Sequence, residues 1–484
     1  MCGLVAISGT SSSAYEAFFG LMNLQHRGQD GAGILSISPK NGNGFHLQRG
    51  SGLIENVFSE RTFKSLVGNA ALAHTRYSTV GHNDPNLLQP FLDFQVGIGL
   101  AHNGNIVNFY SLREQIQDES GGKLAIESDS ALILHLLAKE LKGKEINSTN
   151  VFAAIESCAN QLVGSYSVAC LTKTGDIFGF RDPYGVRPLV FGKKQTTQSP
   201  VVYGLASETI ALNFLGFESL EDILPGEAIY IAADGTVTRK LLKQEGFAPC
   251  MFEWVYFARV ESVFDNKSVY QVRFRLGQVL AKQLRELGVK ADVVIPVPET
   301  SRVAAIALAE SLGIPFRELL IKNRYINRTF ILDDQASRQE AVRRKLFPIG
   351  EELDGKSCLI VDDSIVRGNT ARQIVKLVRQ AGAGEVTIVS TCPAIINPCY
   401  YGIDFPSPNE LVAHERSDQE IATTLGADRV VYQTLEGLME AIGTNRLCLG
   451  CLTGKYPTSV TNGNEFESMR LKDRAAHATK NKCG

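Results

Sequence analysis

Hydrophobic positions follow two different patterns along the chain. Up to about residue 239 they form short runs that alternate with polar positions, as at residues 5–7, 96–98 and 228–231, in a stretch rich in Gly, Ser and Asn. Such runs are typical of β-strands, whereas the pattern over Asp129–Leu141 predicts a helix. We therefore expect a first domain in which sheets are combined with helices.

In the second part of the chain, continuous apolar runs alternate with longer helical patterns. Strands are predicted at residues 293–295, 358–361 and 386–389, and helices at residues 304–312 and 370–380. Strands that are apolar throughout and linked by helices form parallel sheets covered on both faces. This region therefore predicts an α/β domain with a mainly parallel sheet.

The domain boundaries follow from these patterns. We assign the first domain to residues 1–239 and the second to residues 248–445, because the stretch between them is polar and contains a glycine. Residues 446–484 form a C-terminal segment whose tail, from Thr461, is polar and rich in Asn and Lys. We expect this tail to be poorly ordered, as chain ends often are.

Composition and charge restrict the classes of function. Hydrophobic residues make up 44% of the chain and charged residues 21%, which is typical of a folded, water-soluble protein. The formal net charge of −2 offers no general attraction to nucleic acid or to anionic membranes, so small molecules are the expected partners. No apolar run is long enough to span a bilayer, and the N-terminus lacks a secretory signal. The ten cysteines are distributed over the whole chain, unlike the dense cysteine framework of small secreted domains. These features predict a cytoplasmic protein without disulfides.

Cys2 is a candidate nucleophile because removal of Met1 would give it a free α-amine. A terminal amine can serve as the base for the thiol of its own residue, although a buried cysteine in an edge strand is the simpler alternative. Four segments in order carry a further signal: residues 2–6 (CGLVA), 24–30 (LQHRGQD), 74–79 (HTRYST) and 102–105 (HNGN). Together they resemble the class II glutamine amidotransferase family. The resemblance implies an amino-terminal-nucleophile αββα sandwich that hydrolyses glutamine through a thioester on Cys2.

The resemblance also implies roles for individual residues of this domain. The Asn103 side chain and the Gly104 N–H would be oxyanion donors, a pair suited to developing negative charge. Arg76, assisted by Thr79, would bind the glutamine α-carboxylate, and Asp129 would bind the α-ammonium. Structural alternatives stay open for each: a helix cap for Arg76, a hairpin turn for the Asn–Gly pair, and a helix N-cap for Asp129.

A second candidate site lies in residues 358–370 (CLIVDDSIVRGNT), an apolar strand followed by an acidic pair and a turn that opens a helix. Two carboxylates at a strand end can bind ribose hydroxyls and a hard divalent cation, and the turn can present N–H groups to a phosphate. The alternative for the acidic pair alone is a turn with an N-cap. The whole segment resembles the type I phosphoribosyltransferase signature, with Asn369 where relatives usually have Thr. The residues implied to bind phosphoribosyl pyrophosphate are Asp362, Asp363, Ser364, Arg367, Gly368, Asn369 and Thr370.

Two further loops resemble parts of the same site. Residues 296–302 (PVPETSR) follow a predicted strand and look like the pyrophosphate loop, whereas alone they would be a proline-stiffened connection. Residues 322–330 (KNRYINRTF) resemble the closing loop of amidophosphoribosyltransferases and would bring cations to the leaving pyrophosphate. The residues implied to contact the substrate here are Glu299, Thr300, Ser301, Lys322 and Tyr325, and the implied magnesium ligands are Thr300, Asp362 and Asp363.

Four of the ten cysteines form a candidate ligand set. Cys448 and Cys451 are spaced so that two thiolates can bind one metal centre, which by itself suits zinc, iron or a redox dithiol. Cys250 and Cys399 lie far off in sequence. All four match the ligand positions of the iron–sulfur branch of the amidophosphoribosyltransferases. The resemblance therefore implies a [4Fe–4S] cluster that acts as a structural clasp.

Joined in one chain, the two halves resemble the amidophosphoribosyltransferase family over nearly the whole length. The implied reaction converts glutamine, 5-phosphoribosyl 1-pyrophosphate and water to 5-phosphoribosylamine, glutamate and pyrophosphate, the first committed step of purine synthesis. The resemblance also implies a homo-oligomer, a dimer or tetramer, inhibited by purine nucleotides. The alternatives are a non-catalytic phosphoribosyl pyrophosphate sensor, against which the presence of Cys2 argues, and another class II glutamine-dependent synthase, against which the acidic pair argues.

Overall fold

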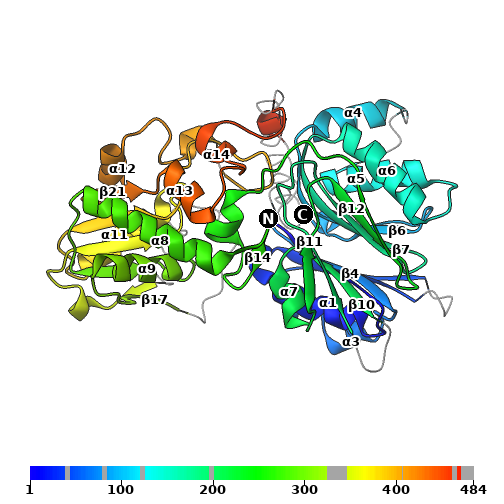
Figure 1. Ribbon diagram of the computed structural model, residues 1–484, viewed down its shortest axis with the longest axis horizontal. Helices are drawn as coiled ribbons and strands as arrows, with labels where there is room; N and C mark the ends of the chain where they lie inside the picture. Colours follow the sequence, from blue (N-terminus) through cyan, green and yellow to red (C-terminus); the bar gives the residue numbers. More distant parts are fainter. Residues whose placement is uncertain are drawn as a thin grey trace, which may run out of the picture.

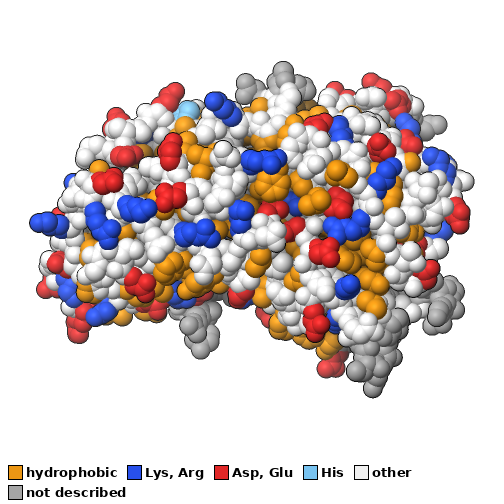
Figure 2. Space-filling model, in the orientation of Figure 1, with side chains coloured by type: hydrophobic (Ala, Val, Ile, Leu, Met, Phe, Trp, Pro, Cys, Tyr) orange, Lys and Arg blue, Asp and Glu red, His pale blue; other side chains and the backbone are white. Residues whose placement is uncertain are grey.

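The computed structural model describes residues 1–38, 44–78, 84–119, 121, 126–195, 201–323, 346–405, 407–460, 466–469 and 472. The chain folds into two lobes, and its N-terminus lies between them (Figure 1). No helix within the described ranges is long and apolar enough to cross a bilayer. On the face shown in Figure 2, basic and acidic side chains are interspersed, in keeping with the small net charge.

Two antiparallel sheets form the centre of the first lobe. The seven-stranded sheet has the order β11-β9-β10-β1-β4-β2-β3, and the six-stranded sheet has the order β13-β12-β8-β7-β6-β5. The strands of the first sheet are β1 (Gly3–Ser8), β2 (Gly31–Ile37), β3 (Phe45–Ser51), β4 (Ala70–Arg76), β9 (Val190–Lys194), β10 (Val202–Ala206) and β11 (Ser219–Asp222). Those of the second are β5 (Phe91–Asp93), β6 (Ile98–Ile106), β7 (Gly164–Thr172), β8 (Ile177–Arg181), β12 (Glu227–Ile231) and β13 (Val237–Leu241).

Strand β1 shows how these layers stack. Leu4 and Ala6 pack into the core between the two sheets, whereas Val5 and Ile7 pack into the core on the outer face. Every residue of the strand is buried because helices cover that outer face. The outer helices are α1 (Ser13–Met22) and α7 (Thr209–Phe214) on the first sheet, and α4 (Phe109–Glu119), α5 (Asp129–Leu141) and α6 (Ser148–Gln161) on the second. The predicted αββα sandwich is confirmed.

One predicted strand of this lobe was placed too early. Residues 96–98 were expected to be extended, but β6 begins only at Ile98, and the two preceding residues lie in the turn after β5. Gly97 has a φ of +81°, a left-handed conformation that glycine adopts without strain and that ends the extended run.

The second lobe is built on a four-stranded parallel sheet with the order β16-β19-β20-β21. Its strands are β16 (Val293–Pro296), β19 (Cys358–Asp362), β20 (Val386–Ser390) and β21 (Arg429–Tyr432). On β19, Leu359 and Val361 pack against one helical layer, and Cys358 and Ile360 against the other. The layers are α8 (Val269–Glu286) with α9 (Arg302–Leu312), and α11 (Asn369–Gln380) with α12 (Asp418–Leu425). The predicted parallel α/β domain is therefore confirmed.

The two lobes share a continuous apolar core. The cluster that covers α5 and α6 continues through residues 248–276 and 392–452, which include the π-helix Glu253–Phe257, α13 (Leu435–Ile442) and α14 (Gly450–Thr453). The domain division at residues 239, 248 and 446 therefore stays a proposal. The expectation for the tail needs one correction: Phe466 is only 5% exposed and packs into this same core, whereas most of residues 461–484 lie outside the described ranges.

Candidate active sites

Cys2 immediately precedes β1 and lines a pocket in the first lobe. Its Sγ accepts a hydrogen bond from the backbone N–H of Tyr77 at 3.5 Å, and its own backbone N–H donates to Oδ1 of Asn103 at 3.2 Å. The side chain is partly exposed. The thiol is therefore open to the pocket, while its backbone is held by β6.

Asn103 and Gly104 lie inside β6, so the hairpin turn left open by the sequence is wrong. Asn103 is fully buried, and because its Oδ1 accepts from Cys2, its Nδ2 is a donor without a hydrogen-bond partner in the described part of the chain. Gly104 has a φ of +152°, and a Cβ there would lie 2.0 Å from the backbone oxygen of Ser165. A buried, unused N–H beside a thiol is a donor suited to an oxyanion.

Three charged residues line the same pocket: Arg76, Asp129 and the exposed Glu127. Arg76 ends β4 rather than capping a helix, and burial lowers the pKa of its guanidinium. Asp129 opens α5, but the N-cap is Ser128, whose Oγ accepts from the N–H of Ala131 at 3.2 Å. The carboxylate of Asp129 accepts from the backbone N–H groups of Ser130, at 2.8 Å, and Ile106, at 3.4 Å, and it also lines the pocket. There, Arg76 and Asp129 match the two charges of an α-amino acid. Thr79 lies outside the described residues.

Two buried histidines adjoin this pocket. Burial lowers the pKa of His74 to about 3, and burial also lowers the pKa of His102, whose Nδ1 lies 3.1 Å from Oγ of Ser130. Both rings are neutral near pH 7 as a result. They add no positive charge to the pocket.

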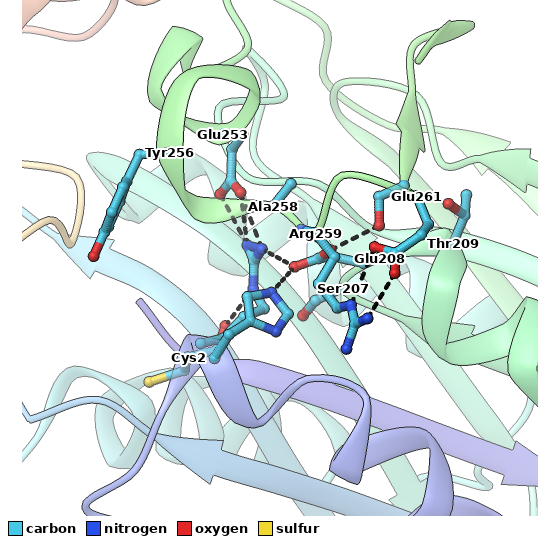
Figure 3. Close-up of polar contacts among 12 residues, drawn as sticks. Cys2, Ser207, Glu208, Thr209, Glu253, Tyr256, Ala258, Arg259 and Glu261 are labelled. Carbon is cyan, nitrogen blue, oxygen red and sulfur yellow. Dashed lines mark hydrogen bonds and ion pairs between the residues drawn. The ribbon is translucent and has the colours of Figure 1, made fainter. Parts of the chain in front are cut away.

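A buried ion-pair network fixes the backbone of Cys2, with Glu208 and Glu253 reaching it from different elements (Figure 3). Nε of Arg27 donates to the Cys2 oxygen at 3.1 Å, while its Nη atoms bind Glu208 at 2.6 Å and Glu253 at 2.9 Å. Although burial opposes ionisation, His26 and Arg27 lower the pKa of Glu208 to about 2. This network could not be predicted from the sequence, because the partners stand 181 and 226 residues from Arg27 and share no local pattern.

The acidic pair lies at the carboxyl edge of the parallel sheet, where ligands of open α/β sheets bind. Asp362 ends β19 and is 8% exposed, and Asp363 follows it. Burial raises the pKa of both carboxyls, to about 6 at Asp363, and repulsion from Asp363 raises that of Asp362 further. Ser364 Oγ donates to Asp363 at 2.9 Å. Full ionisation of the pair is therefore unfavourable in this structure, and a cation or hydroxyl donors would stabilise the ionised form.

The predicted pyrophosphate loop begins beside this pair. β16 and β19 are parallel neighbours, and the N–H of Val297 donates to the oxygen of Val361 at 2.8 Å. Glu299 is exposed and Thr300 is partly exposed. Ser301 is buried instead, and its Oγ donates to the backbone oxygen of Val297 at 2.6 Å. The structure thus leaves the first two side chains open to a ligand and uses the third to stabilise the loop.

The turn after the acidic pair leads into the N-terminus of α11. Gly368 is the N-cap and has a φ of +75°, where a larger residue would be strained. Asn369 and Thr370 form the first turn and are exposed. Arg367 is also exposed, and its Nε lies 3.1 Å from a carboxylate oxygen of Glu410. The exposed helix N-terminus can bind a phosphate, as its dipole favours.

The predicted closing loop falls mostly outside the described residues, Tyr325 included. Lys322 is exposed at the end of β17 (Leu320–Lys322). This strand pairs with β18 (Leu346–Pro348), and Lys322 lies opposite Leu346. The two ends of the segment are therefore held together beside the sheet.

The four predicted ligand cysteines gather in the core shared by the lobes. Cys250 and Cys448 form an isolated parallel β-bridge, and the oxygen of Cys451 accepts from the N–H of Asn397, two residues before Cys399. All four are at most 8% exposed. Burial raises the pKa of Cys250 to about 11, and burial raises those of Cys448 and Cys451 well above the ordinary value. In the described ranges, no three His, Cys, Asp or Glu side chains are close enough to bind a single metal ion.

Two family models match the chain: a glutamine amidotransferase domain at residues 74–213 and a phosphoribosyl transferase domain at residues 266–399. The amidophosphoribosyltransferase of Pseudomonas aeruginosa is 42% identical over 494 residues, which cover 100% of this chain and 97% of the relative. The chain belongs to the amidophosphoribosyltransferase family. The amidophosphoribosyltransferase of Methanothermobacter thermautotrophicus is also 42% identical, over 98% of each chain.

Solved amidophosphoribosyltransferase structures share the fold over nearly the full length. The glutamine phosphoribosyl pyrophosphate amidotransferase of B. subtilis, complexed with ADP and GMP, is 36% identical with a TM-score of 0.84, covering 95% of this chain and 98% of that one. A structure described as the allosteric regulatory enzyme of purine biosynthesis has a TM-score of 0.85 at 36% identity, covering 95% and 97%. The chain is thus an enzyme that combines a glutamine amidotransferase with a phosphoribosyltransferase.

Several pocket residues were not predicted from the sequence. Tyr110 and Phe466 line the pocket together with Gly402, and Tyr77 lies in the HTRYST motif but was given no role. The rings of Tyr110 and Phe466 belong to no motif, and Phe466 lies in a segment expected to be poorly ordered. The fold, not the local sequence, brings them to Cys2.

Proposed function

We propose that this chain makes 5-phosphoribosylamine, glutamate and pyrophosphate from glutamine, 5-phosphoribosyl 1-pyrophosphate and water, as the first committed step of purine synthesis. The observation that carries the proposal is the buried amide of Asn103: its Oδ1 accepts from the N–H of Cys2, and its Nδ2 has no hydrogen-bond partner in the described part of the chain. Cys2 itself lines a pocket with Arg76 and Asp129. A thiol, an oxyanion donor and two opposite charges match the amide and α-amino acid ends of glutamine.

In the glutaminase step, Met1 must first be removed, because it lines the pocket and blocks the α-amine of Cys2. The freed amine takes the thiol proton, and Sγ attacks the glutamine amide carbon. Asn103 Nδ2 and the Gly104 N–H then stabilise the oxyanion, after which ammonia leaves and water hydrolyses the thioester. Arg76, with Thr79, binds the α-carboxylate and Asp129 the α-ammonium throughout.

In the transfer step, ammonia displaces pyrophosphate from the anomeric carbon. Asp362 and Asp363 bind the ribose hydroxyls and, with Thr300, would hold a magnesium ion, which would supply positive charge to the pyrophosphate. Their raised pKa values support this assignment, because a cation would stabilise the ionised pair. The remaining contacts divide by position: Ser364, Arg367, Gly368, Asn369 and Thr370 at the 5-phosphate, Glu299 and Ser301 at the pyrophosphate loop, and Lys322 and Tyr325 at the closing loop.

Cys250, Cys399, Cys448 and Cys451 would hold a [4Fe–4S] cluster. Their shared burial fits this ligand set, since burial raises the pKa of Cys250, Cys448 and Cys451 and so disfavours their free thiolates, a form that a metal would stabilise. A cubane takes one thiolate on each iron, so its ligands need not converge on a single point. The cluster would supply a structural link between the segments that carry these cysteines.

Three further proposals concern the whole enzyme. We infer that it is a dimer or tetramer, that purine nucleotides inhibit it, and that it works in the cytoplasm. The B. subtilis relative was solved with ADP and GMP, which supports nucleotide binding. Nine cysteines in the described ranges are free thiols, in keeping with a reducing compartment.

The direct test of the glutaminase assignment replaces the nucleophile. Cys2→Ala should lower glutamine-dependent synthesis more than about a thousandfold, while synthesis from high ammonia continues. Cys158→Ala is the matched control and should keep both activities, because Cys158 is a buried cysteine of α6 that is not among the pocket-lining residues. Glutamine use at the wild-type rate by Cys2→Ala would overturn the proposal.

A further inference from the structure

The segment that follows Cys399 touches the glutaminase pocket. Gly402 lines the pocket and has a φ of +96°. A Cβ built on it would lie 2.8 Å from the backbone oxygen of Gly104 and 3.1 Å from its carbonyl carbon. The backbone of Gly402 is therefore packed directly against the peptide unit of the proposed oxyanion glycine.

Two hydrogen bonds tie the same segment to β6, which carries this glycine, and to its neighbouring strand β7. Nδ2 of Asn105, in β6, donates to the oxygen of Tyr400 at 2.9 Å, and Oγ of Ser165, in β7, donates to the oxygen of Tyr401 at 3.1 Å. Asn105 and Ser165 face each other across the β6–β7 ladder. The segment thus binds β6 and β7 at one pair of facing residues, and the β6 member of that pair directly follows Gly104.

The segment is itself firmly held. Tyr401 is 1% exposed, its hydroxyl bonds Oγ1 of Thr458 at 2.8 Å, and its N–H donates to Sγ of Cys399 at 3.4 Å. Nε of Arg187 also donates to the Tyr401 oxygen, at 3.0 Å, while its Nη1 binds Glu253 at 3.0 Å. The contact on the oxyanion strand is therefore rigid and is linked to the network at Cys2.

We propose that residues 400–402 position the oxyanion donors of the glutaminase site. Asn103 and Gly104 act on the substrate, whereas Gly402, Tyr400 and Tyr401 act through them by fixing the strand. The inference rests on the proposed function, in which Asn103 and Gly104 are the oxyanion donors. Because such donors act on the transition state more than on bound glutamine, loosening them lowers kcat rather than raising KM.

The test enlarges Gly402 and measures both nitrogen sources. Gly402→Ala should lower the glutamine-dependent kcat about tenfold or more, with KM for glutamine and ammonia-dependent kcat within twofold of wild type. Gly443→Ala is the matched control, since Gly443 has a φ of +76° and an added Cβ would approach no atom more closely than 3.8 Å. That variant should keep both activities. Iron content and melting temperature should be equal in the two variants.

A milder variant keeps the test decisive if Gly402→Ala does not fold. Ser165→Ala removes only the bond to the Tyr401 oxygen and should lower the glutamine-dependent kcat several-fold without changing ammonia use. Wild-type glutamine kcat in both variants, or an equal loss with both nitrogen sources, would overturn the inference. Asn103→Ala distinguishes a failure of the oxyanion assignment from a failure of the positioning role. If Asn103→Ala leaves glutamine use intact, the oxyanion assignment is wrong. If Asn103→Ala lowers the glutamine-dependent kcat but Gly402→Ala and Ser165→Ala do not, only the positioning role is wrong.

Discussion

Nε of Arg27 donates to the backbone oxygen of Cys2 at 3.1 Å, so a buried guanidinium fixes the carbonyl of the proposed nucleophile. The same guanidinium is shared by Glu208 and Glu253, which are both at most 3% exposed. Glu253 is three residues from Cys250, and it also binds Arg187 at 3.0 Å. The backbone of the glutaminase site is thus anchored to the segment that carries a proposed cluster ligand.

Removing one carboxylate from this network should destabilise the fold. Glu253→Ala removes a carboxylate that pairs with the buried guanidiniums of Arg27 and Arg187. The free energy of unfolding should fall by about 3–5 kcal/mol. Urea unfolding followed by fluorescence of Trp254, the single tryptophan, should show an earlier transition. Glu261→Ala removes only a half-exposed partner of Arg259 and should cost about 0–1 kcal/mol. Equal stability of the two variants would contradict the role of the network.

The acidic pair should be needed for both nitrogen sources. Replacing Asp362 and Asp363 by Asn removes the charge that would hold the ribose and magnesium, so synthesis should fall at least about a hundredfold with glutamine or ammonia. Glutamate release in the absence of phosphoribosyl pyrophosphate should persist. Asp354→Asn, an exposed carboxylate, serves as the control. Unchanged substrate affinity of the double variant at matched magnesium would disprove the assignment.

Binding at this pair should release protons. Burial raises the pKa of Asp363 to about 6 and raises that of Asp362 well above its ordinary value, so the unliganded pair retains protons near pH 6. A cation favours the ionised form, so affinity for the magnesium–substrate complex should rise with pH across this window. Calorimetry in buffers of different ionisation enthalpy should detect the released protons. Binding that is independent of buffer and pH would speak against the raised pKa values.

Protein purified without air should carry the cluster. It should be brown and contain iron and acid-labile sulfide in about equal amounts, as a cubane requires. Cys451→Ser should lower both contents and the activity, whereas Cys170→Ser, in β7, should leave the iron content unchanged. Colourless, fully active protein that contains zinc would disprove the cluster and leave the two catalytic assignments standing.

The elements of the fold were largely predictable because their patterns are local. The helix predicted over Asp129–Leu141 has those bounds, since apolar periodicity and the preceding Ser128 cap act within a few residues. A parallel strand was likewise predicted from the apolar run at residues 358–361, and the observed strand is Cys358–Asp362. The turn at Gly97 was not predicted, because the apolar Val96 before it extends the strand-like pattern. The neighbouring residues alone do not determine the backbone conformation of a glycine.

The sites were predictable only in part. Motifs identified the residues around Cys2 and Asp362, but Arg27 meets partners 181 and 226 residues away, and Gly402 meets Gly104 only in the folded chain. Such contacts depend on the packing of two lobes and leave no periodic trace in the sequence. The buried Phe466 could not be predicted for the same reason: it lies in a polar tail, yet in the folded chain it lines the pocket.

The coupling of the two half-reactions is the central claim, and one assay tests it most directly. Glutamate and pyrophosphate should be measured together in the wild-type enzyme, with each substrate omitted in turn. We predict equal amounts of both products when both substrates are present, and no pyrophosphate release when glutamine is omitted and no ammonia is added. Glutamate formation without any pyrophosphate, in the presence of both substrates and magnesium, would contradict the account.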